Sequence, residues 1–230
     1  MTEIIPAILP NDFEDVENQV SSVNGLVSTV QIDICDGHFV PSFTWPYRKH
    51  DENFEAILRE ERGLPFWEDI DYEIDLMVAN PSSEVDRWTM AGASRIIVHI
   101  ESARPEEIVE IIKKSASLVE IGIAINIATS LTALEMILSD KEAGEKVAFI
   151  QCMGIDKIGF QGQTFDSAVL QKIRGIHKAY PDIPISVDGG VNLDSAKELL
   201  DAGATRLVIG SAIFTSSNIP ETIHTFQNIR

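Results

Sequence analysis

Two stretches decide the fold: IDICDGHFVP at residues 32–41 and VDGGVN at residues 187–192. In each, an apolar run rich in β-branched residues, typical of a strand, reaches an aspartate just before a glycine turn; the two aspartates are Asp33 and Asp188. If both strands belong to one barrel of parallel strands, the carboxylates lie at the same rim and face each other across a pocket. Opposed carboxylates can take a proton from one face of a carbon and return one to the other face, which inverts a stereocentre.

The rest of the chain repeats this alternation of strand and helix. Its Ile- and Val-rich runs are typical of strands buried on both faces, and amphipathic helical stretches separate them. We expect eight strands, near residues 4–9, 29–34, 72–78, 95–100, 120–126, 147–153, 185–188 and 206–210. Eight strand–helix units in 230 residues predict an α/β fold of the (β/α)₈ TIM-barrel class, with residues 1–230 as a single domain. A doubly wound open sheet is the alternative, although no GxGxxG follows the first strand.

Helix boundaries carry their own signals. Asp12 is a cap candidate, and Pro105 stands at a favourable first-turn position. Asn192 or Asp194 can cap a later helix, which Gly203 ends.

Composition bounds the partners and the compartment. The net charge of −18 argues against nucleic acid, because phosphate backbones are bound by clustered Lys and Arg. No apolar run approaches the roughly 18 residues that span a bilayer, and the N-terminus lacks the features of a signal peptide. Cys35 and Cys152 form no CxxC motif, so we expect buried, reduced thiols in a cytoplasmic protein. A homo-oligomer is the default expectation by symmetry.

The strand ends bring polar groups to one rim. Residues two apart in a strand share a face, so Gln31 points the same way as Asp33, and Asp75 the same way as Met77. A shell of Gln31, Asp33, Asp75 and Asp188 offers only oxygen donors, which suit magnesium, manganese, calcium or iron better than zinc. In a metal-free site the carboxylates raise each other's pKa, and one of them stays protonated. The sequence leaves both outcomes open.

Two glycine turns predict a phosphate site. Gly189 and Gly190 follow Asp188 and precede a helix, and Gly210 and Ser211 follow the last strand. Backbone N–H groups after the seventh and eighth strands are a recurrent phosphate site in this fold. Other polar residues have structural interpretations: Asp36 is expected to close a turn, and His99 to be a hydrogen-bonded core histidine.

Together these stretches resemble the ribulose-phosphate 3-epimerase family over nearly the whole chain. The resemblance is carried by IPAIL (5–9), IDICDGHFVP (32–41), DLMVANP (75–81), VHIES (98–102), NIATS (126–130), GFQGQTF (159–165), VDGGVN (187–192) and IGSAIF (209–214). Within it, DGHFVP is highly specific. The resemblance implies a ribulose-phosphate-binding TIM barrel that epimerises carbon 3 of a small phosphorylated sugar, D-ribulose 5-phosphate, to give D-xylulose 5-phosphate.

The resemblance also implies roles for individual residues. By position, Asp33 and Asp188 match the family's acid–base pair, and Met77 and Met153 match methionines of its pocket. The positions that match its phosphate grip are Gly162, Gly189, Gly190, Gly210 and Ser211. The family holds a divalent metal with two histidines and the two aspartates.

This chain departs from that pattern at several positions. Gln31 and Asp75 stand where the family has its metal-binding histidines, and Ala7 replaces a serine of the first strand. The connection between the second and third strands, at about residues 42–70, is extended and expected to be lid-like. Its basic cluster at 48–50 is either a solvated loop face or part of a lid that contacts a substrate or a partner. Two alternatives follow: a divergent phosphosugar isomerase or lyase with an oxygen-only metal site, and a non-catalytic phosphosugar-binding homologue.

Overall fold

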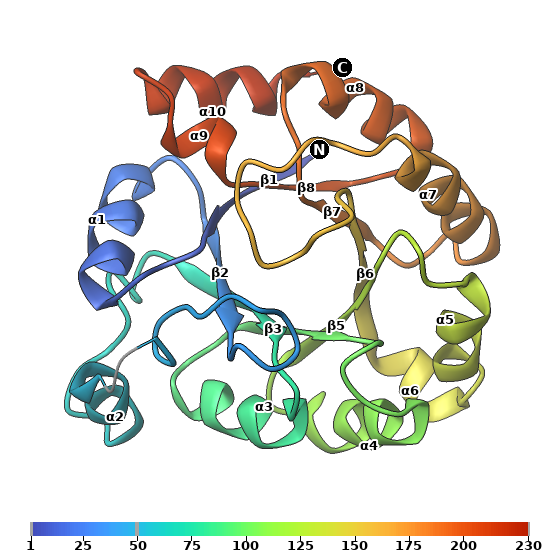
Figure 1. Cartoon of the computed structure of the whole chain (residues 1–230), viewed down its shortest axis with the longest axis horizontal. Coiled ribbons are helices and arrows are strands. Elements are labelled where there is room, and N and C mark those ends of the chain that lie inside the picture. The colour runs from blue at the N-terminus through green and yellow to red at the C-terminus, as the bar shows by residue number, and fades with distance from the viewer. Residues whose placement is uncertain (1, 49–50, 230) are drawn as a thin grey trace.

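Eight parallel strands close into one barrel in the order β1 to β8, and helices surround it (Figure 1). The computed structural model describes residues 2–48 and 51–229. The strands are β1 (Glu3–Ile8), β2 (Thr29–Cys35), β3 (Asp71–Met77), β4 (Arg95–His99), β5 (Glu120–Ile125), β6 (Val147–Met153), β7 (Ile185–Asp188) and β8 (Arg206–Ile209). All eight lie within about one residue of their expected bounds, which confirms the (β/α)₈ barrel.

The helices begin and end at the signals in the sequence. They are α1 (Phe13–Val23), α2 (Glu52–Leu58), α3 (Pro81–Met90), α4 (Pro105–Ser115), α5 (Leu131–Leu138), α6 (Lys141–Lys146), α7 (Ala168–Ala179), α8 (Leu193–Ala202), α9 (Ser211–Phe214) and α10 (Ile219–Gln227). Asp12 caps α1, and Asn192 rather than Asp194 caps α8 by accepting two backbone N–H bonds. Gly203 ends α8 with φ of 116°, a left-handed conformation that favours glycine.

Each strand presents one face to the helices and one to the barrel interior. On β2, Ile32 and Ile34 belong to the large apolar core beneath the helices. Burying each such side chain contributes roughly 1.5–3 kcal/mol. The alternate residues Gln31, Asp33 and Cys35 turn inward, where Cys35 joins a separate interior cluster. This alternation places polar groups inside a barrel whose outer strand faces are apolar.

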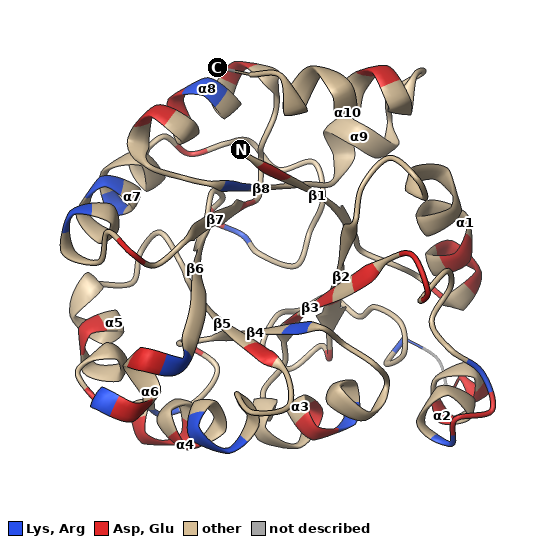
Figure 2. Cartoon of the chain, turned by 180° about the vertical axis from the view of Figure 1, so that it is seen from behind, with Lys and Arg blue, Asp and Glu red and all other residues tan. Residues whose placement is uncertain are grey.

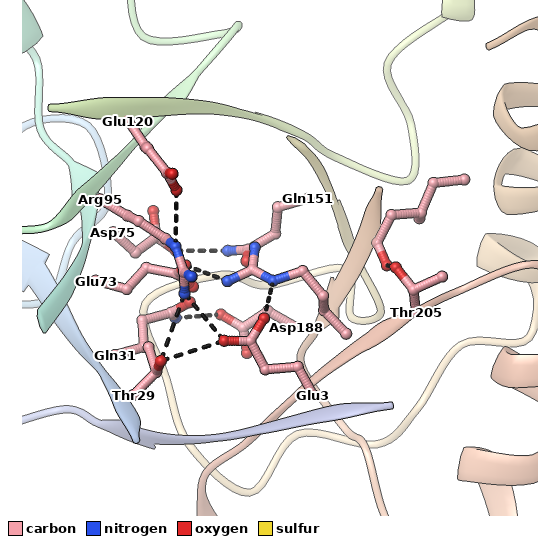
Figure 3. A network of polar contacts seen from close by, with 12 residues as sticks. Glu3, Thr29, Gln31, Glu73, Asp75, Arg95, Glu120, Gln151, Asp188 and Thr205 are labelled. Atoms are coloured by element: carbon pink, nitrogen blue, oxygen red, sulfur yellow. Dashed lines mark hydrogen bonds and ion pairs between the residues drawn. The ribbon is translucent and has the colours of Figure 1, made fainter. Parts of the chain in front are cut away.

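An ion-pair network closes the amino end of the barrel. Arg206 donates from Nε to Glu3 at 2.9 Å and from Nη2 to Glu73, and Arg95 donates to Glu3 at 3.0 Å. The Arg206 guanidinium also lies 3.9 Å from the centre of the Phe149 ring. Buried charges are tolerated only when they are paired. These ion pairs connect β1, β3, β4 and β8 at the amino end of the barrel (Figure 3).

The extended connection at residues 42–70 joins the helical ring. Thr44 bonds the backbone of β2 through its hydroxyl, and Trp45 is buried among aromatic rings of the outer layer. The connection then forms α2, which lies between α1 and α3 in Figure 1. Its expected role as a lid stays a prediction, and Lys49 and His50 of its basic cluster lie outside the described residues.

The outer helices carry much of the acidic charge. Figure 2 shows Asp and Glu on several of them, including α1, α4 and α6. Both cysteines are free and buried, as expected. Within residues 2–48 and 51–229, every helix is too short or too polar to cross a bilayer. Oligomeric state and compartment stay predictions.

Candidate active site

Three aspartates from β2, β3 and β7 meet inside the barrel near the carboxyl ends of the strands. One carboxylate oxygen from each of Asp33, Asp75 and Asp188 lies within 4.8 Å of the other two. Asp33 and Asp75 are partners in the β2–β3 register. Asp33 and Asp188 each keep 8% of their surface exposed, whereas Asp75 is fully buried. Two of the three carboxylates therefore border open space, and the third lies beneath them.

The side-chain amide of Gln31 connects Asp33 and Asp188, the two members of this group that keep a small exposed surface. Gln31 Nε2 donates to Asp33 Oδ1 at 2.7 Å and to Asp188 Oδ2 at 2.9 Å, so one side chain spans β2 and β7 (Figure 3). The other amide atom, Oε1, is buried and has no hydrogen-bond partner in the part of the chain that the structure describes. The amide is thus held from one side only, by the carboxylates.

Asp75 is held by different partners. His99 Nε2 lies 2.9 Å from its Oδ1, and Gln151 Nε2 donates to its Oδ2 at 3.2 Å. His99 is the hydrogen-bonded core histidine that its strand position predicts. Gln151 is absent from the sequence predictions, although it shares the inward face of β6 with Met153, two residues further on. The spacing of two residues from Met153 was the sequence signal from which Gln151 could have been predicted to face the barrel interior.

Burial and crowding set the protonation of the aspartates. Burial raises the pKa of Asp33 well above its ordinary value, and the Asp188 and Asp75 carboxylates add to the rise. Burial, followed by the Asp75 carboxylate, raises the pKa of Asp188 to about 7. Burial alone would lower the pKa of His99, but the charge and hydrogen bond of Asp75, together with the Glu101 and Asp188 carboxylates, raise it. The site therefore retains protons that free carboxylates release well below neutral pH.

A pocket opens above the aspartates at the carboxyl end of the barrel. Its lining residues are Ala7, Asp33, Met77, Met153, Ile155, Gly159, Phe160, Gln161, Gly162, Gln163, Asp188, Gly189, Gly190, Val191, Val208, Gly210 and Ser211. The expected catalytic, methionine and glycine positions thus surround one space, while Gln31 and Asp75 lie below it. The segment after β6 contributes residues that the sequence did not single out; Gln161, for example, donates to the Ala7 carbonyl at 3.4 Å.

The glycine turn after β7 packs closely against the segment that follows β6. Gly189 and Gly190 have φ of 101° and 69°, in the left-handed region. A Cβ atom on Gly190 would lie 2.7 Å from the backbone of Phe165, so the turn packs directly on the segment after β6. Both features require glycine. They bring the backbone of the β7–α8 turn to the pocket wall.

A neighbouring turn has a structural explanation. Asp36 accepts backbone N–H bonds from His38 at 2.8 Å and Phe39 at 3.1 Å, and from Ala79 at 2.8 Å. It closes the turn after β2, as expected, and ties that turn to the end of β3. This contact fixes the segment that carries the carboxyl end of β2.

A larger groove lies between α3 and α4, with a volume of about 770 Å³ compared with about 50 Å³ for the pocket. Its charged lining, which includes Arg104 and Lys114, sits on the outer helices. The smaller pocket is the better candidate because the buried carboxylates and glycine turns converge there.

The aspartate cluster fits a hard divalent cation. Such ions take oxygen ligands at roughly 2.0–2.6 Å, so ligand atoms across one ion are separated by up to about twice that length. The 4.8 Å limit on the separations of Asp33, Asp75 and Asp188 agrees with this geometry. A cation would also compensate the neighbouring carboxylates, whose repulsion adds to the effect of burial in raising the pKa of Asp33.

Comparisons with known proteins bear on the family and on the fold. The model of the Ribulose-phosphate 3 epimerase family matches residues 3–214. The ribulose-phosphate 3-epimerase of Bacillus subtilis (strain 168) is 30% identical over 230 residues, covering 97% of each chain. The cytoplasmic isoform of Oryza sativa subsp. japonica is also 30% identical, covering 96% of this chain and 91% of that protein.

Solved structures show the same architecture at lower identity. KGPDC from Streptococcus mutans superposes with a TM-score of 0.70 at 14% identity, covering 99% of this chain and 96% of that one. A 3-hexulose-6-phosphate synthase gives 0.68 at 18% identity, covering 99% and 98%. These similarities bear on the fold alone, and they agree with a TIM barrel.

Proposed function

The chain belongs to the ribulose-phosphate 3-epimerase family and is an enzyme of the isomerase class, and we propose that it converts D-ribulose 5-phosphate into D-xylulose 5-phosphate. The observation that carries this proposal is the placement of Asp33 and Asp188. They come from β2 and β7, border one pocket, and share one amide donor. A sugar carbon held between them would be open to proton transfer from two sides.

In this reaction one aspartate removes the proton from carbon 3 and the other delivers a proton to the opposite face. The adjacent carbonyl of the ketose accepts the electron pair, which gives an enediolate. The raised pKa values of both acids support this division, because the donor must keep its proton near neutral pH. Without a bound cation, the pKa of Asp188 is raised to about 7, so both of its forms are populated near neutral pH. The two residues exchange roles when the direction reverses.

We further propose that Asp33, Asp75 and Asp188 hold a divalent cation. Magnesium, manganese or iron fits the all-oxygen donors better than zinc. When bound, such an ion supplies positive charge that stabilises the enediolate oxygens. Asp75, fixed by His99 and Gln151, offers the least mobile carboxylate of the three.

The phosphate group is assigned to the glycine turns. Gly162, Gly189, Gly190, Gly210 and Ser211 border the pocket on the side of β7, β8 and the segment after β6. Backbone N–H groups in such turns bind phosphate without added cationic side chains, which suits so acidic a chain. Met77 and Met153 would contact the apolar faces of the sugar.

Hydrogen exchange at carbon 3 tests the two-aspartate mechanism. In D₂O, Asp33→Asn and Asp188→Asn should each abolish inversion. Each variant should still exchange the carbon 3 hydrogen of one epimer, a different epimer for each variant. Asp194→Asn, on the exposed first turn of α8, is the matched control and should invert at the wild-type rate. If either site variant interconverts the epimers at the wild-type rate, the proposal is wrong.

The two alternatives predict different results. A divergent isomerase or lyase would act on another ketose phosphate and leave D-ribulose 5-phosphate unchanged. A non-catalytic homologue would bind sugar phosphates without turnover under any metal. Neither alternative is supported by the comparisons. Rapid epimerisation of D-ribulose 5-phosphate would reject both.

A further inference from the structure

Gln31 contacts both proposed catalytic acids. Its Nε2 lies 2.7 Å from Asp33 Oδ1 and 2.9 Å from Asp188 Oδ2, and the side chain is fully buried. The two acids are far apart along the chain and come from strands that are not neighbours in the barrel. Through these two hydrogen bonds, Gln31 couples the position of the Asp33 carboxylate to that of Asp188.

The chemistry of the amide determines which atom faces the acids. An amide nitrogen carries two hydrogens and donates two bonds at once, whereas the amide oxygen only accepts. An oxygen at 2.7 and 2.9 Å from two ionised carboxylates would be repelled by both, unless a cation lay between them or one acid donated its proton to the amide oxygen. To act as a metal ligand, Gln31 would have to turn its amide over and lose both of these bonds.

The three aspartates also need no fourth side chain to form a cation site. Their oxygens already lie within 4.8 Å of one another. Gln151 offers a comparison, because its amide donates to Asp75 alone at 3.2 Å. Both glutamines thus direct nitrogen toward carboxylates, and in each the Oε1 atom has no partner among the described residues. A donor role therefore explains the orientation of both amides, since the nitrogen of each faces a carboxylate.

We propose that Gln31 is a positioning residue that bridges Asp33 and Asp188 through its amide nitrogen, and that it is not a ligand of the metal. This inference rests on the proposed function, since it takes the two aspartates as the acid–base pair. The bridge sets the separation of the two carboxylates and orients them toward the pocket. Its loss would misplace both acids while leaving the substrate-binding surface intact.

Gln31→Met tests the bridge through two independent readouts. It keeps the length of the side chain and removes the donor. The kcat should fall by roughly 100-fold, as misplacement of catalytic groups by about 1 Å can cause, with KM unchanged within about threefold. The number of waters on bound manganese, counted by electron paramagnetic resonance in water enriched in the magnetic oxygen isotope, should stay unchanged because no ligand is removed. A true ligand predicts one more bound water in place of the lost amide. Manganese affinity does not separate the two roles, because losing a hydrogen-bond partner of a ligand also weakens binding by about 10–100-fold.

Gln151→Met is the matched control. It removes the same group from β6, contacts neither member of the pair, and should lower kcat by less than Gln31→Met does. If Gln31→Met does not fold, Gln31→Asn keeps the amide but is one methylene too short to reach both acids, and it should show the same kcat loss. An additional manganese-bound water, or a kcat at the wild-type level, in the folded variant overturns the bridge.

The outcomes separate this inference from the proposed function. If Asp188→Asn still inverts carbon 3, the proposed function fails and the bridge fails with it. If Asp188→Asn is inactive while Gln31→Met is fully active, only the bridge is wrong. If the wild-type chain binds no manganese, Gln31 is not a ligand of that ion, and the kcat and KM of Gln31→Met decide.

Discussion

His99 and Asp75 form a fully buried pair, in which His99 Nε2 lies 2.9 Å from Asp75 Oδ1. The pair joins β4 to β3, and Gln151 bonds the second oxygen of the same carboxylate from β6. Asp75 is therefore held on both oxygens, whereas Asp33 and Asp188 share one amide and border the pocket. This difference separates a carboxylate held on both oxygens from two that border the pocket, as the proposed proton exchange with a substrate requires.

Replacing His99 by Leu should destabilise the fold because it leaves Asp75 buried without its imidazole partner. Breaking one side of a buried pair typically costs about 3–5 kcal/mol. Urea denaturation at neutral pH measures the loss. His224→Leu, at an exposed position on α10, should change the free energy of unfolding by no more than about 0.5 kcal/mol. Equal losses in the two variants would contradict a special role for the pair.

Asp188→Asn should stabilise the protein above neutral pH. Burial raises the pKa of Asp188 from 3.8 to about 7, so the folded chain holds a proton that the unfolded chain releases. The stability from this proton is full below about pH 4 and is lost as pH rises to about 7. At roughly 1.4 kcal/mol per pKa unit, the loss is on the order of a few kcal/mol.

The stability of the Asp188→Asn variant lacks this dependence on pH, because asparagine does not titrate. Its advantage over the wild type should be largest at pH 8 and shrink toward pH 4, as measured by urea denaturation across that range. An advantage that grows as the pH falls would show that Asp188 is charged and stabilising in the fold.

Arg206→Met should destabilise the fold because it breaks the ion-pair network at the amino end of the barrel. Glu73 would remain buried with Arg95 as its nearest cation, 3.9 Å away, and stability should fall by about 3–5 kcal/mol. Adding Glu73→Leu should recover most of this loss, because no buried carboxylate then lacks its partner. A double-variant cycle by denaturant unfolding measures the coupling. Strict additivity of the two changes would contradict it.

Gly190→Ala should disturb the turn after β7 that is proposed to bind the phosphate. The alanine would hold an unfavourable φ of 69°, and its Cβ would lie 2.7 Å from the Phe165 backbone. Gly25→Ala is matched in strain, with φ of 78°, but its Cβ would meet nothing within 4 Å. Both variants should lose roughly 1–2 kcal/mol from the left-handed conformation. Only Gly190→Ala should also raise KM for the sugar phosphate, by about tenfold or more; equal KM values would remove this turn from the site.

The strands were readable from sequence because their packing is repetitive. A parallel strand buried on both faces leaves a continuous apolar run, and the eight runs matched the observed strands within about one residue. Asp33 and Asp188 followed from the same regularity, since strand ends of such a barrel meet at one rim. The caps at Asp12 and Asn192 are local signals of the same kind.

Other features had no local signal. The sequence predicts Gln31 as a metal ligand, and no local signal predicts the approach of Asp188 from β7, on which the proposed amide bridge depends. Likewise, no spacing in the chain pairs Gln151 with Asp75, or Arg206 with Glu73.

The sequence alone therefore determined the barrel, its rim and the residue types that reach it, because backbone period and side-chain burial act over a few neighbouring residues. The tertiary structure alone decided which polar groups pair inside the barrel. Those contacts depend on the register and closure of eight strands, and a shift of one residue would turn each inward side chain to the other face.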